Sequence, residues 1–245
     1  MKVAILQPGY LPWLGFFEQV YQADLFILYN DVQYTKQDWR NRNRIKTPHG
    51  VQYLTVPVGK VPTHTLIQEV RLPKDSTWKE KHLRLIRQAY QHAPYFALYF
   101  EPIGACIQAD YAYLQDLDAA LIRLLCGFLG LQDRQFCFSS DITYRKTTDK
   151  SLNLLNICLS VGASALYDGL SARRFLNLTV FRQHGIAVTF QDYVHPVYPQ
   201  LFGRFVPHLS VIDLLFNTGP QSLDYLTGNR ECSIDLGFGK QARQK

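Results

Sequence analysis

Short apolar runs near both ends of the chain alternate with amphipathic stretches. Runs rich in β-branched and aromatic residues predict strands over residues 3–6, 25–29, 52–58, 66–71, 165–167 and 186–191. Between the first two, residues 13–22 carry apolar side chains at the spacing of one helical face. A strand, a helix and a second strand within about 30 residues form a βαβ unit, which favours a parallel sheet.

Helical patterns dominate the middle of the chain and return near its end. They cover residues 77–92, 113–129, 150–161, 175–184, 209–219 and 221–226. The order of elements predicts an α/β fold with a mostly parallel sheet and a Rossmann-like layered architecture. We expect a single domain over residues 1–228, a helical insertion or cap over about 75–160, and a polar, flexible tail over 229–245.

Composition narrows the class of partner. The net charge of +6 and a pI near 9.0 predict attraction to anions such as phosphates, nucleotides, nucleic acid or an anionic membrane surface. The longest apolar run is far shorter than the roughly 20 residues that span a bilayer, and the N-terminus lacks a secretory core, so we expect a cytoplasmic protein without membrane insertion. The five cysteines show no metal-ligand spacing, which argues against a structural zinc and predicts reduced thiols.

Polar side chains follow several of the predicted strands. Gln7 comes after the first strand, Asp31 and Gln33 after the second, Asp168 after the fifth and Gln191 after the sixth. The carboxyl ends of parallel strands share one edge of a sheet, where ligands of open α/β folds bind. Turn chemistry accounts for an Asp-Gly pair but not for three glutamines. The sequence therefore predicts a site for a small polar ligand at this edge.

A second cluster lies just beyond the second strand. It is dense in flat rings, amides and guanidinium groups, has no apolar periodicity, and predicts a ligand-binding loop. Aromatic rings stack on sugars or nucleobases, and arginines bind phosphate or carboxylate through two parallel hydrogen bonds. The predicted substrate-binding residues of this loop and of the turn after the first strand are Tyr10, Trp13, Tyr34, Trp39, Arg40, Asn41, Arg42 and Asn43. Arg44 belongs to the same basic group, and Arg173 marks a second anion site next to a helix start.

Four side chains are candidates for acid–base chemistry. Asp31 and Asp168 suit a general base or the orientation of a basic group, with a turn or cap carboxylate as the alternative. His195 and His208 flank a proline-rich loop, and an unperturbed imidazole titrates near neutral pH. We expect His195, Asp31 and Asp168 to be catalytic and His208 to bind substrate. No phosphate-loop, GxGxxG, GxSxG or HExxH motif is present, and no metal ligand is predicted.

With these residues assembled, the chain resembles the WbqC-like family. The matching blocks are AILQPGYLPWLGFFEQV, ADLFILYNDVQYTKQDWRNRNRIKTPHG, YLTVPV, ALYDG, HGIAVTFQDYVHPVYPQ and FVPHLSVIDLLFNTG. They run from the N-terminus to about Gly219. A departure is Asn30, which stands where the family pattern suggests the first acid of a pair, and this weakens a two-carboxylate metal site.

The resemblance implies a transferase of bacterial surface-glycan (O-antigen, lipopolysaccharide) or nucleotide-sugar metabolism that moves an acyl or aminoacyl group, glycine included, to an amino sugar. His195 or Asp31 would be the base, Gln7, Asn41 and Asn43 would donate hydrogen bonds to the oxyanion, and Arg40 and Arg42 would hold a diphosphate. The substrate is then a nucleotide- or phosphate-linked small molecule, and the cofactor is unassigned, with an activated acyl donor, a nucleotide or magnesium all compatible. Alternatives are a nucleotidyl-transfer or ATP-dependent ligation enzyme, and a non-catalytic protein that binds glycan or nucleic acid.

Overall fold

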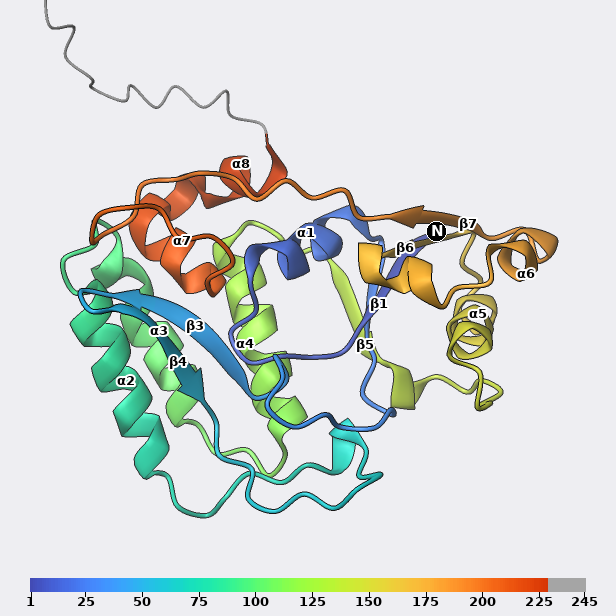
Figure 1. Ribbon diagram of the computed structural model, residues 1–245, viewed down its shortest axis with the longest axis horizontal. Coiled ribbons are helices and arrows are strands. Elements are labelled where there is room, and N and C mark those ends of the chain that lie inside the picture. The colour runs from blue at the N-terminus through green and yellow to red at the C-terminus, as the bar shows by residue number, and fades with distance from the viewer. Residues whose placement is uncertain (229–245) are drawn as a thin grey trace, which may run out of the picture.

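The computed structural model describes residues 1–228, which fold around a five-stranded parallel sheet (Figure 1). The strands are β1 (Lys2–Leu6), β2 (Leu25–Leu28), β5 (Gln135–Phe138), β6 (Ala165–Asp168) and β7 (Ala187–Phe190). Their order in the sheet is β5-β2-β1-β6-β7, the order of a doubly wound fold. The expected α/β architecture is confirmed. The winding reverses between β1 and β6, and open α/β sheets bind ligands beside such a reversal.

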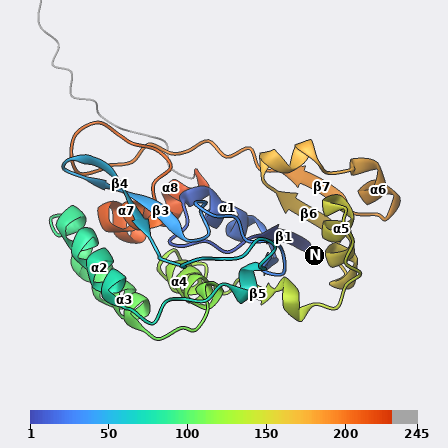
Figure 2. The same ribbon diagram turned by 60° about the horizontal axis from the view of Figure 1, so that its bottom comes forward.

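Helices cover both faces of this sheet. On one face lie α1 (Leu14–Gln22), α4 (Leu114–Phe128), α7 (Val211–Thr218) and α8 (Ser222–Thr227). On the other face α5 (Lys150–Ser160) and α6 (Leu178–Gln183) pack against Val3, Ile5 and Leu166. Figures 1 and 2 show α5 and α6 on the opposite side of the molecule from α2 (Thr77–Tyr90) and α3 (Phe96–Gln108). The alternation of buried residues along each strand produces these two apolar faces.

A separate antiparallel hairpin lies beside α2. It is formed by β3 (Arg42–Thr47) and β4 (Gly50–Thr55), so the basic segment expected to be a loop is a strand from Arg42 onward. In β3 the side chains of Asn43 and Ile45 are buried while Arg42 and Arg44 are half-buried, which is the alternation of a strand. The chain that leads into the hairpin lies against the loop that follows β1, because the Tyr10 amide donates to the carbonyl of Trp39.

Two other predictions differ from the structure. Residues 66–71 form a short 3₁₀ helix (Ile67–Glu69) instead of a strand, because Ile67 and Val70 are buried three residues apart. The expected helical insertion over about 75–160 contains β5, which pairs with β2 in the main sheet, so the insertion ends before residue 135. Short 3₁₀ turns also occur at Ser139–Asp141, Leu170–Arg174 (η3) and Gly219–Gln221. One domain over residues 1–228 stays a prediction, and the predicted tail lies outside the described residues.

Candidate functional site

A cleft lies at the carboxyl end of β1, beside the reversal in strand order. Its volume is about 150 Å³. Three segments form its wall: the end of β1 with the loop after it, the first turn of α1, and the chain that enters β3. The lining residues are Leu6, Gln7, Pro8, Gly9, Pro12, Trp13, Phe16, Trp39, Arg40 and Asn43. The cleft therefore combines Gln7, Trp13, Trp39, Arg40 and Asn43, five of the predicted substrate-binding residues.

The loop between β1 and α1 is held in a strained, closely packed form. A Cβ on Gly9 would come within 2.8 Å of the backbone oxygen of Trp39, so only glycine fits there. The neighbouring Tyr10 amide donates to that same oxygen at 3.2 Å. Leu11 adopts a φ of 46°, which leucine rarely does, and the buried Asn43 amide holds its carbonyl at 2.7 Å. Asn43 thus shapes the cleft through the backbone, because its side-chain NH₂ is committed to Leu11.

The outer wall of the cleft carries the charge and the exposed ring. Trp39 is 46% exposed, and the guanidinium of Arg44 lies 5.7 Å from the centre of its ring. Arg40 forms an ion pair with Asp38, while its buried Nε has no hydrogen-bond partner among residues 1–228. Burial lowers the pKa of Arg40, and the neighbouring Asp38 opposes that shift. The positive charge of Arg40 at the wall of the cleft suits an anionic ligand.

Three aromatic side chains surround Trp13, which lines the cleft. The Trp13 ring lies 5.3 Å from the ring of His208, 5.9 Å from Tyr193 and 6.4 Å from His195. Arg44 donates to the carbonyl of His208 at 2.8 Å, which ties this loop to the β3–β4 hairpin. The segments around residues 13, 44 and 208 are thereby brought together at one rim.

His195, predicted as a catalytic base, has both ring nitrogens occupied. Nδ1 lies 2.8 Å from the carbonyl oxygen of Pro196, and Nε2 accepts the backbone N–H of His208 at 3.1 Å. These bonds fix the neutral ring with its proton on Nδ1. Burial lowers its pKa, and the nearby His208 adds to that shift. In this structure both nitrogens of His195 are thus committed to the loop, whereas the exposed ring of His208 makes no hydrogen bond within residues 1–228.

Asp31 is also committed to structural contacts. Its carboxylate accepts hydrogen bonds from the hydroxyls of Ser139 and Tyr144 and pairs with the Lys146 ammonium at 2.7 Å. Burial alone would raise its pKa, but the bonds from Lys146, Ser139 and Tyr144 outweigh burial and lower the pKa. These contacts tie the end of β2 to the end of β5. A carboxylate with a lowered pKa and three donors is a poor base, so the geometry gives no support to a catalytic role for Asp31.

Asp168, the third predicted catalytic residue, lies at the end of β6 next to the reversal in strand order. Its carboxyl is 6% exposed and accepts one hydrogen bond, from the Gly169 amide at 2.7 Å. Burial raises its pKa to about 7, and the Gly169 bond only partly opposes this. On β6, Tyr167 points toward α1 and Leu166 toward α5, so alternation points Asp168 toward the α5 face. The cleft lies on the α1 face.

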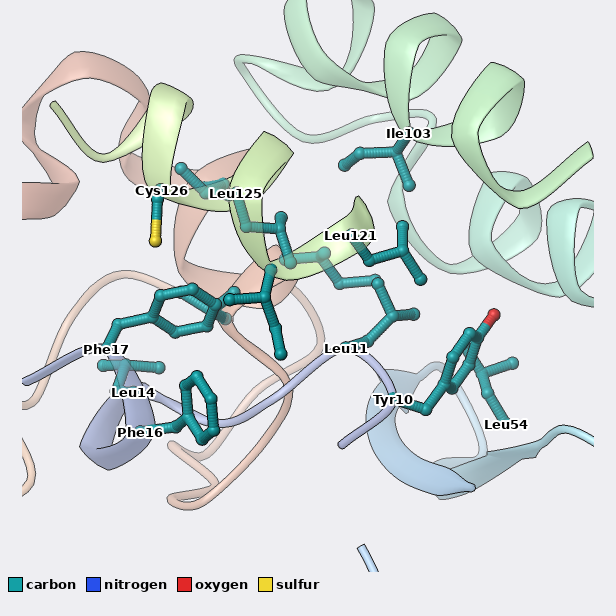
Figure 3. Close-up of a cluster of buried hydrophobic side chains, with 14 of the residues drawn as sticks. Tyr10, Leu11, Leu14, Phe16, Phe17, Leu54, Ile103, Leu121, Leu125 and Cys126 are labelled. Carbon is teal, nitrogen blue, oxygen red and sulfur yellow. The ribbon is translucent and has the colours of Figure 1, made fainter. Parts of the chain in front are cut away.

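Several predicted ligand residues lie in the core. Tyr10 is fully buried within the hydrophobic core (Figure 3). Its hydroxyl bonds to Nδ1 of His82 at 3.0 Å. Tyr34 is 6% exposed, and burial together with the buried Asp118 raises its pKa to about 12. Asn41 is also buried, and its NH₂ donates to the carbonyl of Val56. Their burial leaves these three groups no surface for a substrate in this structure.

Gln191 forms part of an internal polar network that the sequence did not predict. Its NH₂ donates to the Glu18 carboxylate at 2.7 Å and to the Gly15 carbonyl at 2.8 Å, and its oxygen accepts from Gln19. Tyr167 donates to the same Glu18. This network fastens α1 to β6 and β7 underneath the cleft, so Gln191 supports the site from behind.

The remaining predicted residues lie away from the cleft. The Arg42 guanidinium sits 4.8 Å from the Tyr53 ring centre on the hairpin. Gln33 is exposed and bridges to Leu66, and Arg173 on η3 stacks on Phe190 at 5.2 Å. Within residues 1–228, no three or more His, Cys, Asp or Glu side chains gather in a metal-binding arrangement. In that same part of the chain no helix has the length and apolar character needed to cross a bilayer.

The fold and the cleft define a doubly wound α/β protein with a small cleft at its switch point, lined mostly by apolar side chains together with Gln7, Arg40 and Asn43. A model of the WbqC-like protein family matches residues 7–225, and the chain belongs to that family. It is 38% identical over 228 residues to the "Uncharacterized protein Rv1507c" of Mycobacterium tuberculosis (strain ATCC 25618 / H37Rv), covering 92% of this chain and 97% of that relative. No solved structure matches the chain.

Proposed function

We propose that this protein is a transferase that moves an acyl or aminoacyl group to an amino sugar carried on a nucleotide or phosphate. The observation that carries the proposal is the cleft at the end of β1, where Arg40, Gln7 and two tryptophans converge at the start of a helix. Membership of the WbqC-like family supports the glycan part of the proposal. A cavity of about 150 Å³ suits a sugar ring or a phosphate, with the rest of the ligand lying over the exposed Trp39.

The phosphate has two matched partners. The first turn of α1 carries the partial positive charge of a helix N-terminus, and no side chain caps it. Arg40, from the opposite wall, supplies the positive charge of a partly exposed guanidinium. A phosphate bound between them would exchange its hydrogen bonds to water for hydrogen bonds from N–H groups of the protein. Trp13 and Trp39 offer flat rings on which a sugar or base stacks.

Acyl transfer to an amine needs a proton acceptor and an oxyanion donor. The amine nitrogen attacks the acyl carbonyl, the new N–C bond forms, and the bond from carbonyl carbon to the donor's leaving group breaks with its electron pair. We assign the amine proton to His208, whose ring lies beside Trp13 and makes no hydrogen bond within residues 1–228. We assign Gln7 to the oxyanion, because the Asn43 amide is already bound to Leu11.

The experiment is a thermal-shift panel of nucleotide-linked amino sugars, ATP, CTP, acyl-CoA and glycine, each with and without magnesium. A ligand at about 100 times its dissociation constant stabilises by roughly 2.7 kcal/mol, which raises Tm by a few degrees. We expect a shift with nucleotide-linked amino sugars that Arg40→Ala abolishes. Arg42→Ala is the matched control, because Arg42 stacks on Tyr53 outside the cleft and its loss should leave the shift intact.

Three outcomes would contradict this proposal. A shift that Arg42→Ala removes and Arg40→Ala keeps would move the ligand to the hairpin face. A shift with ATP or CTP alone would favour the nucleotidyl-transfer or ligation alternative. If no small molecule shifts Tm and the protein instead binds RNA with a steep dependence on salt, a non-catalytic binding protein is favoured.

A further inference from the structure

Three large apolar side chains project from one short segment that follows β6. Leu170 is 58% exposed, Phe175 44% and Leu178 42%, and they span η3 and the first residue of α6. Between them, Ala172 and Leu176 are buried against α5 and the sheet. Those two anchors fix the backbone, so the outward direction of the three side chains follows from the fold.

The same segment is basic and contains no acid. Residues 169–191 include Arg173, Arg174, Arg182 and His184 but no Asp or Glu. Arg173 and Arg174 are exposed between the apolar side chains, and the Phe190 ring supports Arg173 at 5.2 Å. The flanking acids are Asp168, which is buried, and Asp192, which is exposed beyond β7. Apolar side chains that alternate with guanidinium groups suit a surface with an outer layer of anionic groups and an apolar layer beneath it.

The loop that follows β7 extends this surface. Val194, 84% exposed, is the most exposed large apolar residue of residues 1–228. Both segments begin at the carboxyl ends of neighbouring strands, β6 and β7, at the same edge of the sheet as the cleft. Figure 1 places α6 at the far side from α2, so the helical cap does not cover this region.

We propose that Leu170, Phe175, Leu178, Arg173 and Arg174 form a docking surface for an anionic lipid membrane. The leucines and the phenylalanine enter the headgroup region while the arginines remain at the level of the phosphates. An anionic bilayer fits better than a folded protein partner, because the apolar groups stand apart with guanidinium groups between them. Docking is peripheral and reversible, and it turns the cleft edge toward the membrane.

Vesicle co-sedimentation of the full chain tests the proposal, with vesicles of phosphatidylcholine alone and of phosphatidylcholine with phosphatidylglycerol. We expect binding to the anionic vesicles, weakened by salt, and little to the neutral ones. Removing both charges in Arg173→Ala/Arg174→Ala should weaken binding by about 25-fold, since each basic residue near such a surface contributes about fivefold. Leu170→Ser/Phe175→Ser should weaken it further. Leu98→Ser, a change of an equally exposed leucine on α3, should bind as wild type does.

Circular dichroism and the Tm of each variant are measured as controls to test whether the fold is kept. Equal binding to neutral vesicles, or anionic binding that the arginine and apolar variants leave unchanged, would overturn the proposal. Self-association in light scattering that the apolar double variant abolishes, without vesicle binding, would assign the surface to a second copy of the chain. Ligand shifts in the thermal panel are measured without lipid, so failure here leaves the proposed function separately testable.

Discussion

Replacing Asp168 by Asn should stabilise the protein near pH 8. The free energy of unfolding gained by the substitution should be about 4 kcal/mol larger near pH 8 than at acid pH, because the pKa of Asp168 in the folded protein lies about three units above its ordinary value. Burial raises the pKa of Asp168 from 3.8 to about 7. Between these values the folded state binds more protons than the unfolded state, so wild-type stability falls as pH rises through this window. Asn cannot ionise, and its oxygen can still accept the Gly169 amide.

Urea unfolding of both proteins across about pH 4 to 8 measures this effect. The difference between variant and wild type should be small at the acid end, grow through the window and level off above pH 7. Asp133→Asn is the control, because Asp133 is exposed and its replacement should leave the wild-type pH profile unchanged. A wild type that is more stable than Asp168→Asn near pH 8 would show that the carboxylate is ionised and paired in solution.

Replacing His208 by Asn should lower turnover by roughly 10²- to 10⁴-fold, the usual contribution of a positioned general base. The change rests on the proposed function and requires the substrate that the ligand panel identifies. Asn is chosen because His208 has a φ of 57°, and Asn tolerates that left-handed conformation better than Ala does. The loss therefore reports on the imidazole instead of on backbone strain.

A matched control exists elsewhere in the chain. His64 is also exposed and left-handed, with a φ of 72°, but it lies in the loop before the 3₁₀ helix at residue 67. His64→Asn should retain wild-type turnover. If His208→Asn keeps full activity while Tm and ligand shifts are unchanged, the amine proton goes to another group, and the assignment of His208 is wrong.

Much of the sheet was predictable because its strands are short apolar runs with distinct flanking residues. The runs at residues 3–6, 25–29, 165–167 and 186–191 correspond to β1, β2, β6 and β7. The strand β5 was missed because four residues, QFCF, give too little alternation. The strand β3 was missed because its buried face carries Asn43 along with Ile45, so it lacks the apolar pattern that predicts a strand. The contact that buries Asn43 comes from Leu11, which no local pattern reveals.

For the candidate cleft, the sequence indicated the edge of the sheet better than it indicated the residues that line it. The polar side chains at strand ends directed attention to the carboxyl edge of the sheet, where Gln7, Trp39 and Arg40 line the cleft. Whether a polar side chain is free to bind a ligand or is already engaged in a hydrogen bond or ion pair depends on partners distant in sequence. Lys146 neutralises Asp31, and the carbonyl of Leu11 occupies the amide of Asn43. These are tertiary contacts, so residue type and spacing carry no signal for them.

The most direct test of a ligand at the end of β1 is tryptophan fluorescence. The chain has three tryptophans, of which Trp13 and Trp39 line the cleft and Trp78 lies buried on α2. Nucleotide-linked amino sugars would be titrated into wild type, Trp39→Phe and Trp78→Phe. We predict a saturable change in emission that persists in Trp78→Phe and is strongly reduced in Trp39→Phe. A change that follows Trp78 and is unaffected by Trp39→Phe would place the ligand elsewhere and contradict the proposed site.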